Sequence, residues 1–106
     1  MSDFLEISRD GPVLTWTMNQ PATRNALTGN TAVAEIVAAA AAAAADRTVR
    51  AIILTGAGPV FSSGGNVKDM ARFAEPGIDA DAIRNEYRNG IQRIPRAMWS
   101  LDVPLI

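Results

Sequence analysis

Hydrophobic and polar residues along this chain alternate in short blocks that predict a mixed α/β fold. Apolar positions within residues 4–7 and 13–18 stand on either side of a turn-forming triplet, Asp-Gly-Pro at residues 10–12. This arrangement predicts an N-terminal β-hairpin. Farther along, Ile52, Ile53 and Leu54 form an unbroken apolar run, typical of a strand buried on both faces of a sheet with parallel character. A second apolar run opens at Val103 and predicts another buried strand.

A loop and a long helix are predicted between the hairpin and the first apolar run. Residues 19–27 lack a regular period and contain one proline and two asparagines, so they are expected to form a loop with a tight backbone. Thr28 is a suitable cap for the helix that follows. That helix runs into eight consecutive alanines at residues 38–45, which have high helix propensity and to which we assign no chemistry.

Two further helices are predicted after the run at residues 52–54. The first follows Asn66, a favourable N-cap residue. Its expected apolar face consists of Val67, Met70, Ala71 and Phe73. The second begins near Asp79 or Asp81, and its apolar side chains recur at three- and four-residue spacing: Ile83, Tyr87, Ile91 and Ile94. Pro95 is expected to kink this helix or to begin a second segment.

Composition narrows the chemistry that these 106 residues can perform. Ten basic and eleven acidic residues give a net charge of −1, which offers no field for nucleic acid or a membrane surface. Cysteine and histidine are absent, which excludes thiol nucleophiles, His general bases and His- or Cys-based metal sites within this segment. We therefore expect no metal, no nucleic-acid partner and no membrane partner. The acidic start resembles no secretory or transit peptide, so a cytoplasmic location is expected.

The strongest candidate for chemistry is the stretch of residues 51–70. It predicts a strand, a glycine-containing turn, a core anchor at Phe61 and then Gly64-Gly65 before the helix that Asn66 caps. Unpaired backbone N–H groups beside glycines can hold an anion or a developing oxyanion. The same glycines are also compatible with an ordinary strand-to-helix turn.

Other motifs are weaker. Gly56-Ala57-Gly58 does not continue into a dinucleotide-binding fingerprint, and no phosphate-binding P-loop sequence occurs. Four acidic residues on predicted helix ends or surfaces are interpreted as solvated charges: Glu75, Glu86, Asp79 and Asp81.

The order of the segments resembles the enoyl-CoA hydratase/isomerase (crotonase) superfamily. The resemblance rests on residues 18–27, 50–58, 61–70 and 103–106, and it covers essentially the whole chain. It implies an α/β fold, a crotonase-like spiral of β-β-α units, of which residues 1–106 form the N-terminal part of a single domain. The second oxyanion donor and the catalytic carboxylates of the family would lie beyond Ile106. The resemblance also implies a homo-oligomer, a trimer or dimer of trimers.

The resemblance assigns roles to individual residues. Gly65 matches the position whose backbone N–H supplies one half of the family's oxyanion hole for an acyl-CoA thioester. Arg24 and Lys68 are the expected phosphate partners, and Met70 and Phe73 would face the acyl chain. The remaining residues expected to line the coenzyme A groove are Ala26, Ser63, Gly64, Asn66 and Val67. Asn66 stands where many members carry an aspartate. No cofactor is expected, because coenzyme A is part of the substrate.

The implied reaction is hydration of a 2-enoyl-CoA, a lyase reaction of fatty acid metabolism. Isomerase, thioester hydrolase or decarboxylase chemistry would use the same oxyanion hole. Alternatively, the chain is an inactive fragment with a structural or interaction role, whose final strand presents an unpaired edge. An intact mass near 11 kDa would favour the fragment.

Overall fold

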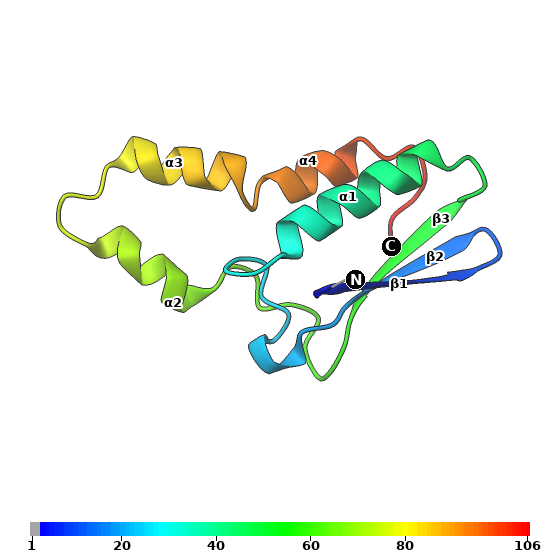
Figure 1. Ribbon diagram of the computed structural model, residues 1–106, viewed down its shortest axis with the longest axis horizontal. Coiled ribbons are helices and arrows are strands. Elements are labelled where there is room, and N and C mark those ends of the chain that lie inside the picture. Colours follow the sequence, from blue (N-terminus) through cyan, green and yellow to red (C-terminus); the bar gives the residue numbers. More distant parts are fainter. Residues whose placement is uncertain (1–2) are drawn as a thin grey trace.

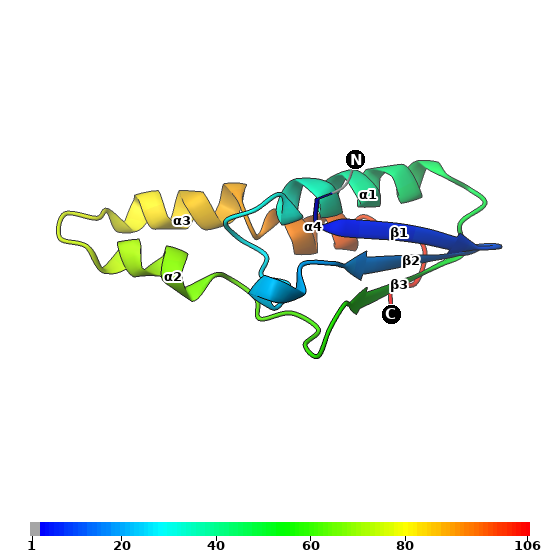
Figure 2. The ribbon, with the colours of Figure 1, turned by 60° about the horizontal axis from the view of Figure 1, so that its bottom comes forward.

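The computed structural model describes residues 3–106, and Met1 and Ser2 of the predicted domain lie outside the described residues. A small sheet forms one layer and helices α1 (Ala32–Ala45) and α4 (Arg93–Trp99) cover one of its faces (Figure 1). Helices α2 (Val67–Met70) and α3 (Ala80–Asn89) extend away from the sheet, as both views show (Figure 2). The molecule is accordingly elongated, with principal extents of 52 × 28 × 23 Å.

The predicted hairpin is confirmed. Strands β1 (Leu5–Asp10) and β2 (Val13–Met18) pair antiparallel, with Leu5 opposite Met18. Strand β3 (Ala51–Gly56) then pairs parallel with β2, giving the sheet order β1-β2-β3. Because parallel neighbours need a crossover, α1 connects β2 to β3 across the covered face.

The segment after Val103 begins to add a further strand beside β3. The Ile52 N–H donates to the Pro104 carbonyl at 3.0 Å, and the Ile106 N–H donates to the Ile52 carbonyl at 2.9 Å. Within residues 3–106, however, β3 is buried on one face only: Ile52 is fully buried, whereas Ile53 is 40% exposed. The prediction of burial on both faces is therefore wrong for this part of the chain, because α1 and α4 lie on the same side of the sheet.

Helix α1 begins four residues later than its predicted cap. The Asn30 side-chain oxygen accepts from the Ala32 N–H at 3.0 Å, so the helix starts at Ala32 and the prediction of Thr28 as its cap is wrong. Thr28 instead uses its hydroxyl oxygen to hold another loop. The alanine tract has a packing role, since its buried members contact the core below the helix: Ala39, Ala40 and Ala43.

The C-terminal end of α1 is tied to the hairpin. The Arg9 guanidinium lies 3.0 Å from the Asp46 carboxylate, whose other oxygen accepts from the Thr48 N–H at 2.9 Å. These contacts, chiefly the hydrogen bonds from Thr48, lower the pKa of Asp46 below its usual value.

The remaining helices follow the predicted order with shifted boundaries. Asp79 caps α3 through a hydrogen bond from the Asp81 N–H, as expected. The break between α3 and α4 lies at Gly90, and Pro95 sits in the first turn of α4, where a missing N–H costs no helical hydrogen bond. Pro95 therefore belongs to the second segment but does not begin it.

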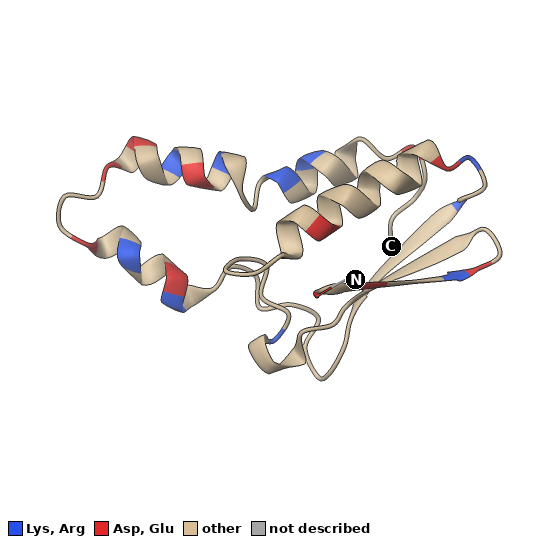
Figure 3. Cartoon of the chain, in the orientation of Figure 1, with Lys and Arg blue, Asp and Glu red and all other residues tan. Residues whose placement is uncertain are grey.

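Charged side chains are scattered over the helices and strand ends, and α1 carries a single charge, Glu35 (Figure 3). None of the helices within residues 3–106 is long and apolar enough to cross a lipid bilayer.

Candidate functional site

Two loops that are far apart in the sequence are joined by backbone hydrogen bonds. Residues 24–28 follow the short 3-10 turn η1 (Pro21–Thr23), and residues 62–66 precede α2. The Ser63 N–H donates to the Arg24 carbonyl at 2.9 Å, and the Leu27 N–H donates to the Gly64 carbonyl at 2.8 Å. The two predicted segments of the candidate groove therefore lie side by side.

Asn25 holds this pair of loops together, although no role of its own was predicted for it from the sequence. Its side chain is fully buried, and its amide nitrogen lies 3.0–3.1 Å from the carbonyl oxygens of Ala57, Val60 and Phe61. Its amide oxygen accepts from the Gln20 N–H at 2.8 Å. Asn25 has a φ of 54°, a left-handed conformation that asparagine adopts more readily than most residues. Its place in a proline- and asparagine-containing loop was the available signal.

Phe61 does not anchor the loop in the core. Its side chain is 57% exposed, and only its backbone carbonyl takes part in the loop network, through Asn25. The prediction from its aromatic side chain is wrong, because the buried amide of Asn25 already holds the returning loop.

The N–H of Gly65 is a free donor within the loop. It makes no hydrogen bond to any described residue from 3 to 106, and Gly65 is half-buried. Neighbouring amides that do have acceptors are those of Ser63, Gly64, Asn66, Lys68 and Asp69. An unpaired backbone donor between paired ones is an available position for an anionic or carbonyl oxygen.

The immediate surroundings of Gly65 are close-packed. A Cβ built on Gly65 would lie 2.2 Å from the terminal methyl of Met70 and 4.0 Å from the Thr28 hydroxyl oxygen. Gly65 does not adopt a left-handed φ, whereas Gly64 does, at 79°. Glycine at position 65 therefore leaves room for the Met70 side chain, whereas glycine at 64 permits the turn.

Asn66 is confirmed as an N-cap. Its side-chain oxygen accepts from the Lys68 N–H at 3.0 Å and from the Asp69 N–H at 3.4 Å. The helix that it caps, α2, has only four residues and continues as the 3-10 turn η2 (Ala71–Ala74). Its dipole is correspondingly small.

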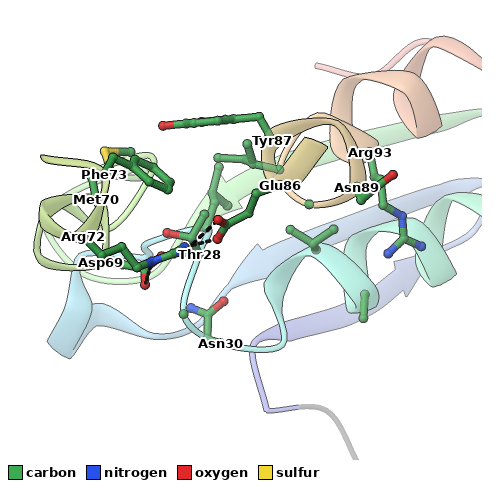
Figure 4. Close-up of a pocket in the computed structure, with 16 residues that line it drawn as sticks. Thr28, Asn30, Asp69, Met70, Arg72, Phe73, Glu86, Tyr87, Asn89 and Arg93 are labelled. Atoms are coloured by element: carbon green, nitrogen blue, oxygen red, sulfur yellow. Dashed lines mark hydrogen bonds and ion pairs between the residues drawn. The ribbon is translucent and has the colours of Figure 1, made fainter. Parts of the chain in front are cut away.

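A cavity of about 320 Å³ opens beside this loop, between the start of α1, the α2–η2 segment and α3 (Figure 4). Met70 and Phe73, the two residues predicted to face an acyl chain, both line it. The Phe73 and Tyr87 rings close one side, with centroids 5.7 Å apart. Gly65 itself is not in the wall, although the Met70 side chain that packs beside it is.

An ion pair between two elements lies in the wall of the same cavity. The Arg72 guanidinium, 4.7 Å above the Phe73 ring, pairs with Asp69 at 3.2 Å and with the carboxylate of Glu86 on α3 (Figure 4). Glu86 is exposed, in agreement with its interpretation as a solvated charge, and it also pairs with Arg72 in the cavity wall. The pairing of Arg72 with Glu86 was not predicted, because nothing in their spacing shows that η2 and α3 face each other.

The other predicted site residues lie outside the cavity wall. Arg24 and Lys68 are exposed, and their side chains form no ion pair within residues 3–106. Ala26 is buried. Val67 is 77% exposed, so the prediction that it shares an apolar face with Met70 and Phe73 is wrong, because α2 ends within one turn.

Comparison with protein-family models and solved structures identifies relatives over nearly the whole chain. The family model described as Enoyl-CoA hydratase/isomerase matches residues 8–106. The chain is similar to the structure of an enoyl-CoA hydratase/carnithine racemase from Magnetospirillum magneticum, with 23% identity and a TM-score of 0.82 over 99% of this chain and 38% of that one. Comparison with curated protein sequences gave no significant match.

Two further structures are closer in sequence. A putative enoyl-CoA hydratase/isomerase from Acinetobacter baumannii has 27% identity and a TM-score of 0.78, over 99% of this chain and 40% of that one. Enoyl-CoA hydratase from Mycobacterium tuberculosis has 41% identity and a TM-score of 0.60, over 74% of this chain and 35% of that one. The chain therefore spans about two fifths or less of the length of these proteins. The family match and the shared fold confirm the resemblance: this chain belongs to the enoyl-CoA hydratase/isomerase family and has the crotonase-type α/β fold.

Proposed function

We propose that this chain forms the thioester-binding part of an acyl-CoA enzyme that adds water to a 2-enoyl-CoA, and that the Gly65 N–H is one donor of its oxyanion hole. The observation that carries the proposal is the free Gly65 N–H, which lies between backbone amides that already have acceptors. A donor of this kind, half-buried beside a cavity, suits an oxygen that becomes negatively charged during a reaction.

During hydration, this donor would stabilise the enolate oxygen of the thioester. When the oxygen of water adds to C3 of a 2-enoyl thioester, the electron pair of the double bond moves toward the thioester carbonyl and forms an enolate oxygen. A proton then adds at C2. An N–H aimed at that oxygen stabilises the enolate more than the substrate, and such a donor contributes about 3 to 4 kcal/mol. We propose that the carboxylates that activate water and protonate C2 belong to the part of the family fold that these residues do not span.

We assign the acyl chain and the phosphates of the ligand to residues near the same loop. Met70 and Phe73 in the cavity wall support an acyl-chain role for this cavity. Arg24 and Lys68 are exposed cations without ion-pair partners within residues 3–106, so both are available for the phosphates of coenzyme A. Backbone at Ala26 and at residues 63–67 would complete the groove. The ligand requires no separate cofactor.

We include a homo-oligomer, a trimer or dimer of trimers, and a cytoplasmic location in the proposal. Sedimentation of the protein expressed from its complete gene would test assembly directly.

The central test compares two substitutions at one residue. Gly65→Pro removes the N–H, and we expect kcat for 2-enoyl-CoA hydration to fall about 10²- to 10³-fold. Gly65→Ala keeps the N–H but displaces the flexible tip of Met70, a residue of the cavity wall, so we expect its kcat to fall far less than that of Gly65→Pro and any loss to appear mainly in KM. Both variants would be measured in the protein expressed from its complete gene, after circular dichroism shows that they are folded.

The outcomes separate the candidate functions. Unchanged turnover in folded Gly65→Pro would exclude this donor from the reaction. Calorimetric titration with coenzyme A and with an acyl-CoA provides a second measurement. If the wild-type protein binds neither at millimolar concentration, the acyl-CoA function is wrong, and a structural role for the chain becomes the better account. Turnover of an isomerase, hydrolase or decarboxylase substrate in place of hydration would keep the oxyanion role and change the reaction.

A further inference from the structure

We infer that Thr28 is a positioning residue that aims the Gly65 N–H, an inference that rests on the proposed function of that donor. Thr28 Oγ1 accepts a hydrogen bond from the Asn66 N–H at 2.7 Å. This side-chain contact joins residues 38 positions apart and ends directly beside Gly65. Thr28 lies in the wall of the cavity (Figure 4).

The peptide before the Gly65 Cα is fixed by Leu27. This peptide contains the Gly64 carbonyl and the Gly65 N–H, and the described chain contains no cis peptide bond. In a trans peptide the C=O and N–H bonds point in opposite directions. Because the Gly64 carbonyl accepts from the Leu27 N–H at 2.8 Å, the Gly65 N–H is directed away from Leu27.

The peptide after the Gly65 Cα is fixed by Thr28. It contains the Asn66 N–H, which donates a hydrogen bond to the Thr28 hydroxyl oxygen. The consecutive residues Leu27 and Thr28 therefore hold both peptide planes that meet at Gly65. Glycine has more backbone freedom than any other residue, so without these two bonds the free N–H would sample a wide range of directions.

Ser62 holds the peptide before the Gly64 Cα, since its hydroxyl oxygen accepts from the Gly64 N–H at 3.0 Å, but other nearby groups do not hold the peptide after the Gly65 Cα. Helix α2 has four residues and starts only at Val67, so it does not fix the 64–65 peptide. Met70 touches Gly65 through a flexible methyl group. The Leu27 bond comes from a backbone N–H, which no ordinary substitution removes without proline. Thr28 is therefore the side chain that holds the peptide after the Gly65 Cα, and its substitution changes the freedom of the backbone at Gly65.

The test uses two substitutions at Thr28 and a matched control in the protein expressed from its complete gene. Thr28→Val keeps the shape and removes the acceptor, whereas Thr28→Ser keeps the acceptor. Thr31→Val removes a hydroxyl from the same segment, where Thr31 donates to the Glu35 carboxylate and forms no hydrogen bond with any of residues 64–66. The readouts are kcat and KM for a 2-enoyl-CoA and the hydrogen-exchange rate of the Asn66 amide.

We expect Thr28→Val to lower kcat about 10- to 100-fold while KM changes less than about threefold, because donors misplaced by a fraction of an ångström stabilise the transition state poorly. Exchange of the Asn66 amide should accelerate in the same variant. Thr28→Ser should restore both values, and Thr31→Val should change neither. A loss that Thr28→Ser does not restore would indicate a packing defect and overturn the inference.

The two proposals fail in different ways. If the wild type turns over a 2-enoyl-CoA but Thr28→Val keeps its kcat, the positioning role is overturned and the proposed function stands. Unchanged Asn66 exchange in Thr28→Val would also overturn it. If the wild type neither binds nor converts an acyl-CoA, the proposed function fails and the role of the donor fails with it.

Discussion

Asn25 is the buried polar residue of the described chain, and it determines the shape of the candidate site. Its single side chain contacts three carbonyls of the loop after β3 and one N–H of the loop after β2. A buried amide of this kind is stabilising only while its partners remain in place, because each carbonyl left without a donor bears the cost of desolvation.

Asn25→Ala should therefore destabilise the protein strongly. Removing the amide leaves partly buried carbonyls and an N–H unpaired and places alanine at a φ of 54°, so we expect the free energy of unfolding to fall by about 2 to 4 kcal/mol. Urea denaturation measures this. The matched control is Asn19→Ala, which removes one exposed hydrogen bond to Glu6 and should cost no more than about 0.5 kcal/mol. Equal losses in the two variants would contradict a special role for Asn25.

Single residues were predictable from sequence where the effect is local. The Asn66 cap is confirmed because its acceptor and donors lie within three residues. Phe61 was wrongly predicted to be buried, and Thr28 was wrongly assigned as a helix cap. Both depend on partners more than thirty positions away, Asn25 for the first and Asn66 for the second.

The alanine tract of α1 shows how a helix with weak amphipathic character is fixed by packing. Ala39, Ala40 and Ala43 are buried, and α4 lies against the same helix. Small side chains at these positions allow the helices and the sheet to approach closely, and larger ones would not fit a close-packed interior. The uncharged tract thus has a structural explanation on its buried face, while Ala41 and Ala42 are exposed.

One substitution at two adjacent positions tests this packing. Ala40→Leu adds volume at a residue that is 1% exposed, so we expect a loss of about 1 to 3 kcal/mol in the free energy of unfolding. Ala41→Leu makes the same change on the exposed face and should shift stability by no more than about 0.5 kcal/mol. Thermal or urea denaturation of both variants provides the measurement. A neutral Ala40→Leu would mean that α1 does not pack on the core as described.

Elements with a strong local pattern were predicted well, and their ends less well. The hairpin, β3 and α3 are confirmed, because hydrophobic patterns and helix caps depend on residues that are adjacent in the sequence. The start of α1 and the break at Gly90 were missed. In both places a side-chain hydrogen bond or a turn is an alternative to the helical conformation. Contacts from outside the segment determine which of the two forms.

For the molecule as a whole, the cavity could not be predicted from the local sequence patterns, because separate elements form its wall. Its wall combines the start of α1 with α2, η2 and α3, and the Arg72–Glu86 ion pair bridges two of these helices. Because this pair is partly exposed, it contributes little to stability, of the order of 1 kcal/mol or less. The pair connects η2 to α3 across the cavity.

The sequence by itself determined the α/β pattern, the hairpin, the parallel strand β3, the Asn66 cap and the resemblance to the enoyl-CoA hydratase/isomerase family, since each rests on residues close together in the chain or on motifs in a fixed order. Tertiary structure decided which backbone donor is left free. The Gly65 N–H is available because Leu27, Thr28 and Asn25 hold the surrounding loop by hydrogen bonds that span more than thirty residues. Such bonds form only after the chain has folded, so no local pattern encodes them.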